Sequence, residues 1–178
     1  MENPDLIQHT QKWVEQFVVR LNICPFARPV IDQNTLTYAI SRSDAESVLT
    51  TLLSECQKMD QHTDQETTLI IFDSIISFDQ YLDILDMANM LLEEREYDGT
   101  YQLASFHPDY QFEGESPDAA SNYTNRSPYP MLHIIREASI EAAIDNLKDP
   151  AQIPERNIEL CEQMGKEALE KQLKQYKS

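Results

Sequence analysis

Glycine is scarce in this chain of 178 residues, which has only three, at Gly99, Gly114 and Gly165. Walker and GxGxxG loops need several glycines close together, because the backbone must approach a phosphate. The classical mononucleotide- and dinucleotide-binding loops are therefore excluded. The sequence assigns no cofactor, and a divalent metal stays open as an alternative.

Cysteines, basic residues and long apolar runs are also few. The three cysteines stand too far apart for a disulfide framework or a CxxC metal knuckle, so we expect reduced thiols. Only 14 Lys and Arg oppose 31 Asp and Glu, and the net charge of −17 would repel a phosphate backbone. We expect no nucleic-acid partner.

Neither a membrane span nor a secretion signal is visible. No apolar run reaches the ~18 residues that a transmembrane helix needs. The first ten residues, MENPDLIQHT, contain no basic region followed by an apolar one. We therefore expect a cytoplasmic protein without a membrane partner.

The remaining composition is that of an ordinary globular domain. Hydrophobic residues make up 41% of the chain and charged residues 25%. A chain of this length can bury roughly two thirds of its unfolded surface. We expect a single domain over residues 1–178.

Hydrophobic periodicity and capping sequences predict nine elements. Helices are expected over about 3–22, 43–56, 77–97, 139–147 and 154–176, and strands over 36–41, 67–72, 101–107 and 131–136. Right-handed crossovers would make the first three strands parallel, and the fourth could return antiparallel beside the third. This order, α-β-α-β-α-β-β-α-α, predicts an α/β or α+β fold. We expect a two- or three-layer sandwich on one small mixed sheet of about four strands, in an order that the sequence does not give.

The connection between the third and fourth strands is irregular for about twenty residues, and connections of that length are usually functional or mobile. His107 and Asp109 begin it. They suit a general base with its orienting carboxylate, or two ligands of a metal. Alternatively, His107 only closes the strand and Asp109 caps a turn.

His133 lies inside the fourth strand, where side-chain alternation places it on the same face as Met131 and opposite Arg136. If the third and fourth strands pair, His107 and His133 could hold a metal together with Cys24, Glu113 or Glu115. The alternative is a core histidine that is satisfied by a hydrogen bond.

Cys24 follows the first helix in the run CPFAR, close to Arg28. A nearby cation lowers the pKa of a thiol and favours the thiolate. Cys24 is therefore a candidate nucleophile, with His107 or His133 as its base. The alternative is a buried cysteine that acts as a small apolar side chain.

Arg126 and Tyr129 lie near two prolines of restricted φ, Pro128 and Pro130. Such a guanidinium and phenol suit the binding of a carboxylate or phosphate, and Arg28 and Arg136 are further candidates for it. The alternative is that Arg126 or Arg136 neutralises carboxylates in a buried ion-pair network.

Three segments carry a resemblance to a known family. They are LNICPFARP at 21–29, SFHPDYQFEG at 105–114 and NRSPYPMLHIIRE at 125–137. Their sequences and order resemble the bacterial family called domain of unknown function 1415. The resemblance implies a single-domain bacterial protein of about this length, and it implies no reaction and no catalytic residue.

Three functions stay open. In the first, segments 21–29, 105–115 and 125–137 converge on a small-molecule or metal site, with an anion as one ligand class and catalysis undecided. In the second, the chain is a non-catalytic acidic interaction module, whose exposed anchors are Tyr110, Phe112, Tyr123 and Tyr129. In the third, these residues only hold the long connection to the sheet. The sequence assigns neither a substrate nor an oligomeric state.

Overall fold

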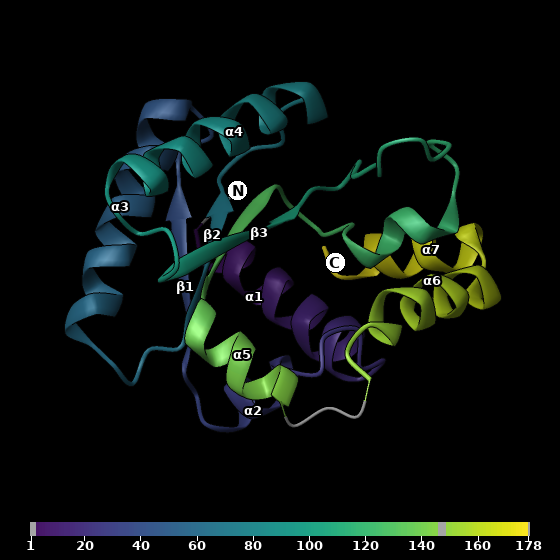
Figure 1. Cartoon of the computed structure of the whole chain (residues 1–178). Coiled ribbons are helices and arrows are strands. Elements are labelled where there is room, and N and C mark those ends of the chain that lie inside the picture. The colour runs from purple at the N-terminus through teal and green to yellow at the C-terminus, as the bar shows by residue number, and fades with distance from the viewer. Residues whose placement is uncertain (1–2, 146–148, 178) are drawn as a thin grey trace.

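The computed structural model describes residues 3–145 and 149–177 and contains one four-stranded sheet (Figure 1). The strands are β1 (Leu36–Ser41), β2 (Thr67–Phe72), β3 (Tyr101–Phe106) and β4 (Met131–Arg136). Their order in the sheet is β1-β2-β4-β3. β1 and β2 are parallel, whereas β4 runs antiparallel to both β2 and β3. The predicted strand directions and the mixed α/β sheet are confirmed.

Strand β2 is fully covered because it lies between β1 and β4. All six residues of its sequence TTLIIF are buried. A continuous apolar run is typical of a strand that is covered on both faces. The sheet therefore lies between two layers of helices, as in a three-layer sandwich.

Helices α3 (Ala45–Gln61) and α4 (Phe78–Glu94) cover one face of the sheet (Figure 1). The predicted capping box of α4 is confirmed, since Ser77 and Gln80 each accept a hydrogen bond from the other's main chain. Helix α3 begins two residues later than predicted, because Asp44 rather than Ser43 caps the N–H of Ser47, and it extends past the predicted end at residue 56 to Gln61.

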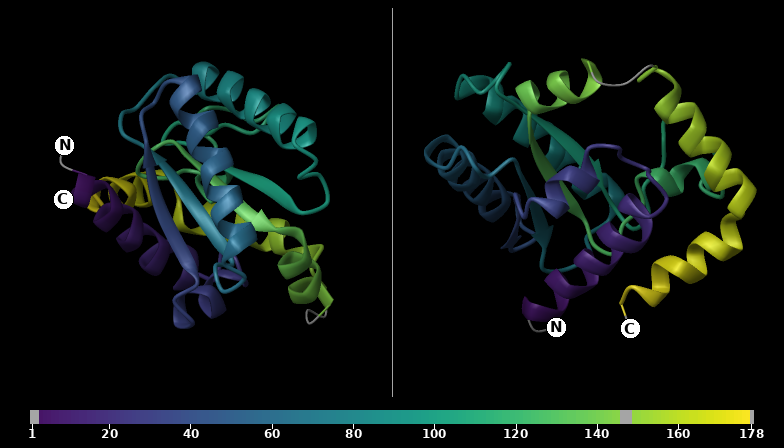
Figure 2. Two further views of the ribbon diagram at one scale, coloured as in Figure 1. Left: turned by 90° about the vertical axis from the view of Figure 1, so that its left-hand side faces the viewer. Right: turned by 90° about the horizontal axis from the view of Figure 1, so that it is seen from below.

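The other face is covered by α1 (Asn3–Trp13), which continues as a π-helical segment η1 (Val14–Val19). Beside it lie α6 (Gln152–Met164), α7 (Lys166–Gln175) and the 3₁₀ turn η2 (Ala120–Thr124). The start of α1 and the end of α7 lie side by side in both views of Figure 2. This layer brings the two ends of the chain together.

Other helical boundaries also differ from those predicted. Residues 27–32, predicted as loop, form the short helix α2 (Ala27–Asp32). The predicted C-terminal helix is divided at Gly165, whose φ of +79° suits glycine. Helix α5 (Glu137–Asp145) begins before Ser139, and the predicted end at Leu147 lies outside the described residues. None of the described helices has the length and apolar content that crossing a membrane requires.

Candidate functional site

The long connection between β3 and β4 is held by its own polar side chains. Asn122 accepts a hydrogen bond from the N–H of Phe112 (3.0 Å) and donates one to the carbonyl of Ser116 (2.9 Å). Asn125 donates to the carbonyl of Ser105 (3.1 Å). These bonds replace the regular ladder that the segment lacks, so the connection is an ordered part of the fold.

The aromatic residues of this connection are not all exposed anchors. Tyr123 is 4% exposed and Tyr129 is 1% exposed, and both belong to the core under α1. Tyr110 and Phe112 are half-buried and contact each other edge to face. The prediction that all four aromatic side chains are exposed to a partner is wrong for Tyr123 and Tyr129, because these two are buried in the core.

His107 is completely buried, and both of its ring nitrogens have main-chain partners. Nε2 lies 3.1 Å from the carbonyl of Ile76, and Nδ1 lies 3.0 Å from the N–H of Asp109. A carbonyl only accepts and an N–H only donates, so the ring must be neutral with its hydrogen on Nε2. Burial lowers the pKa of His107 further. The main chain of Asp109, not its carboxylate, orients the ring, and the histidine closes the strand.

His133 is likewise satisfied within the fold. Its Nε2 lies 2.5 Å from the hydroxyl of Thr67, which donates its own hydrogen to the carbonyl of Ile134. The imidazole must then donate to Thr67. Burial lowers the pKa of His133 to about 4. The interpretation of His133 as a hydrogen-bonded core histidine is confirmed.

The two histidines face opposite sides of the sheet. The ring of His107 contacts Phe78 and Tyr81 below α4, whereas His133 contacts Phe106, which packs in the core under α1. A metal shared by both histidines is therefore not possible. Nowhere in residues 3–145 and 149–177 do three or more His, Cys, Asp or Glu residues gather as a metal would require.

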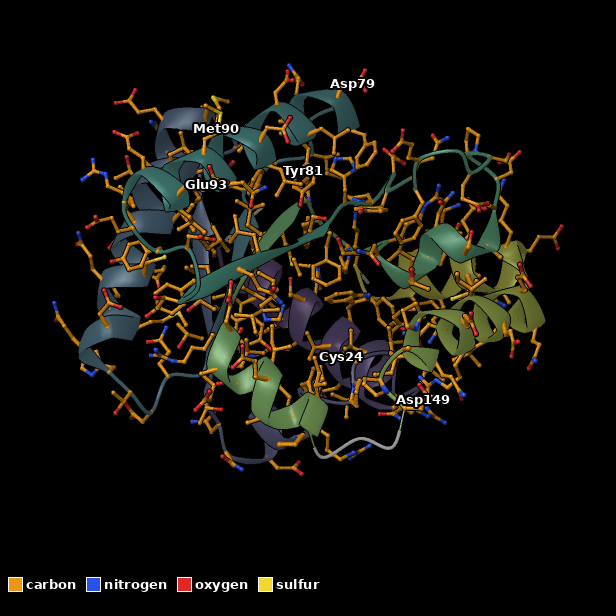
Figure 3. The ribbon with its side chains drawn as sticks, viewed as in Figure 1. Cys24, Asp79, Tyr81, Met90, Glu93 and Asp149 are labelled. Atoms are coloured by element: carbon orange, nitrogen blue, oxygen red, sulfur yellow. The ribbon has the colours of Figure 1, made fainter. Side chains whose placement is uncertain are left out.

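Cys24 lies at the end of the helical layer formed by α1 and η1 (Figure 3). Burial raises the pKa of its thiol, and this outweighs the opposing hydrogen bonds from the main chain of Phe26 and Ala27. Arg28 is exposed and does not lower the pKa as the sequence suggested. The thiolate that a nucleophilic role requires is therefore disfavoured, and Cys24 is a thiol.

Arg126 and Arg136 both bind main-chain carbonyls. Arg126 donates from Nε to Tyr110 (3.0 Å) and from Nη2 to Pro117 (2.9 Å), and its guanidinium lies 4.7 Å from the centre of the Tyr123 ring. It closes the long connection. The predicted ion-pair alternative is wrong in its partners, because carbonyls rather than carboxylates receive these hydrogen bonds.

Arg136 likewise binds main-chain carbonyls, at the end of α3. It donates to the carbonyls of Met59, His62 and Gln65 and stacks on the ring of Tyr101. The last carbonyls of a helix have no partner within the helix, so a guanidinium there stabilises the end of α3. Neither arginine presents a free face as a ligand clamp would.

The cavities near the predicted residues are too small or carry the wrong charge for an anion. A cavity between α1, α7 and Arg126 has a volume of about 10 Å³, enough for one water molecule beside the buried Trp13. A groove of about 360 Å³ lies between Asn22, Pro25 and α6. Three carboxylates line that groove, and its one guanidinium, that of Arg156, donates to the main chain of residues 21 and 22.

One predicted residue, the buried Tyr129, lies in a polar cluster with two half-buried basic side chains. Its hydroxyl is 2.7 Å from Nδ1 of His9 on α1. The ammonium of Lys177, just after α7, lies 4.9 Å from the centre of its ring. We call His9, Tyr129 and Lys177 the terminal cluster, because it joins the two ends of the chain seen together in Figure 2.

The terminal cluster has basic groups that are only partly neutralised. Burial, Lys12 and Lys177 lower the pKa of His9, and Asp5 opposes them. Burial lowers the pKa of Lys177, and Asp109 opposes it. None of the ion pairs among residues 3–145 and 149–177 includes Lys177. The ammonium instead lies over an aromatic face, a contact that leaves its N–H donors available to a ligand.

Sequence reasoning missed His9 and Lys177. Lysine near a helix C-terminus is favourable for the helix itself, so Lys177 does not stand out in the sequence, and His9 carries no motif. The only signal was that the chain has four histidines and that His9 lies on the polar side of a terminal helix. A contact between residues 120 positions apart leaves no local pattern in the sequence.

The match to a family model covers nearly the whole chain. The model of DUF1415, described as a protein of unknown function, matches residues 5–171. The chain belongs to this family. The matched range includes all three segments on which the resemblance was based, so that resemblance to DUF1415 is confirmed. Neither the curated proteins nor the solved structures contain a match to this DUF1415 protein.

Membership in DUF1415 assigns neither a reaction nor a ligand, so the function has to be inferred from the geometry of this chain. The sequence hypothesis placed segments 21–29, 105–115 and 125–137 around one cavity. In the structure, residues from or beside these segments meet in the hydrophobic core instead. Ile23, Tyr123, Tyr129 and Met131 all pack in the cluster under α1. Of these four, only Tyr129 also belongs to the terminal cluster.

Proposed function

We propose that this DUF1415 protein binds a small anionic molecule at the terminal cluster. The observation that carries the proposal is the half-buried ammonium of Lys177, held 4.9 Å over Tyr129 while that phenol is hydrogen-bonded to His9. A partly desolvated ammonium interacts more strongly with an anion than one in bulk water does. The remaining donors of Lys177 and the Nε2 atom of His9 suit a carboxylate or phosphate group.

The charge distribution of the chain supports an anion rather than a cation. The net charge is −17, yet the positive charges of Lys12 and Lys177 both act on His9 and lower its pKa. A local basic site on an acidic protein selects small anions, since large polyanions are repelled by the remaining surface. In this proposal, segment 125–137 contributes Tyr129, whereas segments 105–115 and 21–29 contribute no group that binds the anion.

An NMR titration of the histidine side chains tests the proposal, with inorganic phosphate and citrate as probes at constant ionic strength. A bound anion favours the charged imidazole, so it is expected to raise the pKa of His9. Lys177→Met should abolish this shift. Lys171→Met, which removes an exposed lysine of α7, is the matched control and should keep it.

Two results would overturn the proposal. One is an unchanged pKa of His9 at saturating phosphate and citrate in the wild-type protein. The other is an equal shift in the Lys177→Met and Lys171→Met variants, because the probes would then respond only to the general charge of the protein.

A further inference from the structure

Helix α4 has an exposed acidic face with a regular spacing. Its solvent side carries Asp79, Asp83, Asp86, Met90 and Glu93. The intervals along this row are four, three, four and three residues, so its members lie in one stripe along the helix. The labelled Asp79, Met90 and Glu93 lie on the outer side of α4 in Figure 3, while Tyr81 is directed toward the sheet.

The same side of α4 exposes apolar surface. Met90 is 67% exposed, and Leu82 and Met87, which flank the stripe, are 37% and 39% exposed. Ile75, in the turn before the helix, is 52% exposed. Methionine is common at surfaces that bind helices, because its flexible thioether adapts to the partner's side chains. Most of the large exposed apolar residues in the described part of the chain gather here.

The carboxylates of the stripe have no cationic partner within the described fold. Helix α4 contains no Lys or Arg. The three ion pairs between described residues use Glu55, Asp118 and Glu170 instead. Like charges three or four positions apart destabilise a helix by about 0.2–0.5 kcal/mol for each pair. A partner with cations at the same spacing would remove this repulsion.

From this face we propose that α4 docks a cationic amphipathic helix of another protein. The alternating spacing of four and three residues keeps these side chains in one line along α4, so a second helix lying beside it can face all of them. Charge complementarity requires Lys or Arg opposite Asp79, Asp83, Asp86 and Glu93, with an apolar residue over Met90. A second copy of this chain is a poor occupant, because each copy carries a charge of −17. The inference is independent of the terminal cluster.

Binding of a synthetic helical peptide to the full chain tests this inference. The peptide has about 20 residues, lysines at alternating four- and three-residue intervals and a central leucine. The decisive variant is Asp83→Asn combined with Asp86→Asn. Glu113→Gln with Glu115→Gln, two exposed loop residues, makes the same change in net charge and is the control.

The wild-type and control proteins should bind the peptide equally well. The α4 variant should bind about tenfold more weakly, and Met90→Ser about fivefold more weakly. A peptide of the same composition with its lysines rearranged off one face should bind more weakly to the wild type. Circular dichroism of each variant verifies that α4 remains folded.

Three outcomes would overturn the inference. They are no binding by the wild-type protein, equal weakening in the α4 and control variants, and equal affinity for the rearranged peptide. Self-association of the wild type that Asp83→Asn with Asp86→Asn abolishes, measured by sedimentation, would assign the face to a second copy and would also contradict a partner protein.

Discussion

The long connection between β3 and β4 and the terminal cluster both contain histidine, tyrosine and a cation, but they differ in where the polar atoms are directed. In the connection, His107 and Arg126 bind main-chain atoms of the protein itself. In the terminal cluster, His9 and Lys177 contact one tyrosine and keep further polar atoms available. Reactive residue types therefore indicate a site only when the fold leaves some of their hydrogen-bonding capacity unused.

The largest effect that separates the two regions is expected on the stability of histidine variants. His107→Ala should lower the free energy of unfolding by roughly 3–5 kcal/mol, because it leaves a cavity and removes the partners of Ile76 and Asp109. His9→Ala should cost about 1 kcal/mol, the contribution of one partly exposed hydrogen bond. Urea denaturation measures both. Similar losses for the two variants would remove the distinction between the regions.

A second difference concerns pH. The folded-state pKa of His133 is about 4, below the ordinary histidine value of 6.5, so the native state binds fewer protons than the unfolded chain. The contribution of His133 to stability is then complete above pH 6.5 and is lost as the pH falls toward 4.

Urea denaturation at pH 7 and pH 4.5 measures this contribution. The wild-type protein should lose about 2–3 kcal/mol more than His133→Gln over that interval, since effects of the carboxylates are common to both. Parallel pH profiles of the two proteins would show that the imidazole of His133 is not protected from protons by burial.

Arg126 provides the third comparison, with Arg28 as its control. Arg126→Ala removes two hydrogen bonds to carbonyls and the contact with Tyr123, so a loss of about 2 kcal/mol is expected. Arg28 is exposed, and Arg28→Ala should change stability by less than about 0.5 kcal/mol. Thermal unfolding of both variants gives the difference. An Arg126 variant as stable as the Arg28 variant would return Arg126 to the candidates for ligand binding.

The strands were predictable because their signals are local. The alternation of apolar and polar residues over 36–41 marks β1, and the apolar run TTLIIF marks β2. The predicted bounds of β4 also agree with the structure. Strand direction followed from crossover handedness. The insertion of β4 between β2 and β3 was not predictable, because a return by a long connection is compatible with either neighbour.

The site was harder to predict, because its decisive partners are distant or belong to the main chain. Nothing near His107 in the sequence indicates that the carbonyl of Ile76 will receive its ring hydrogen. Likewise, Lys177 meets Tyr129 only because the end of α7 lies beside the start of α1. A list of reactive residues therefore included Tyr129 but could not say which side chains the fold had already satisfied.

A small effect on stability is expected for Lys177→Met. Methionine keeps much of the apolar length that packs on Tyr129 and removes only the ammonium, whose contact with the ring is worth about 0.5–1 kcal/mol at a partly exposed site. Thermal unfolding should therefore change little, while the response of His9 to phosphate should disappear. A large loss of stability would place Lys177 with Arg126, as a side chain that the fold itself requires.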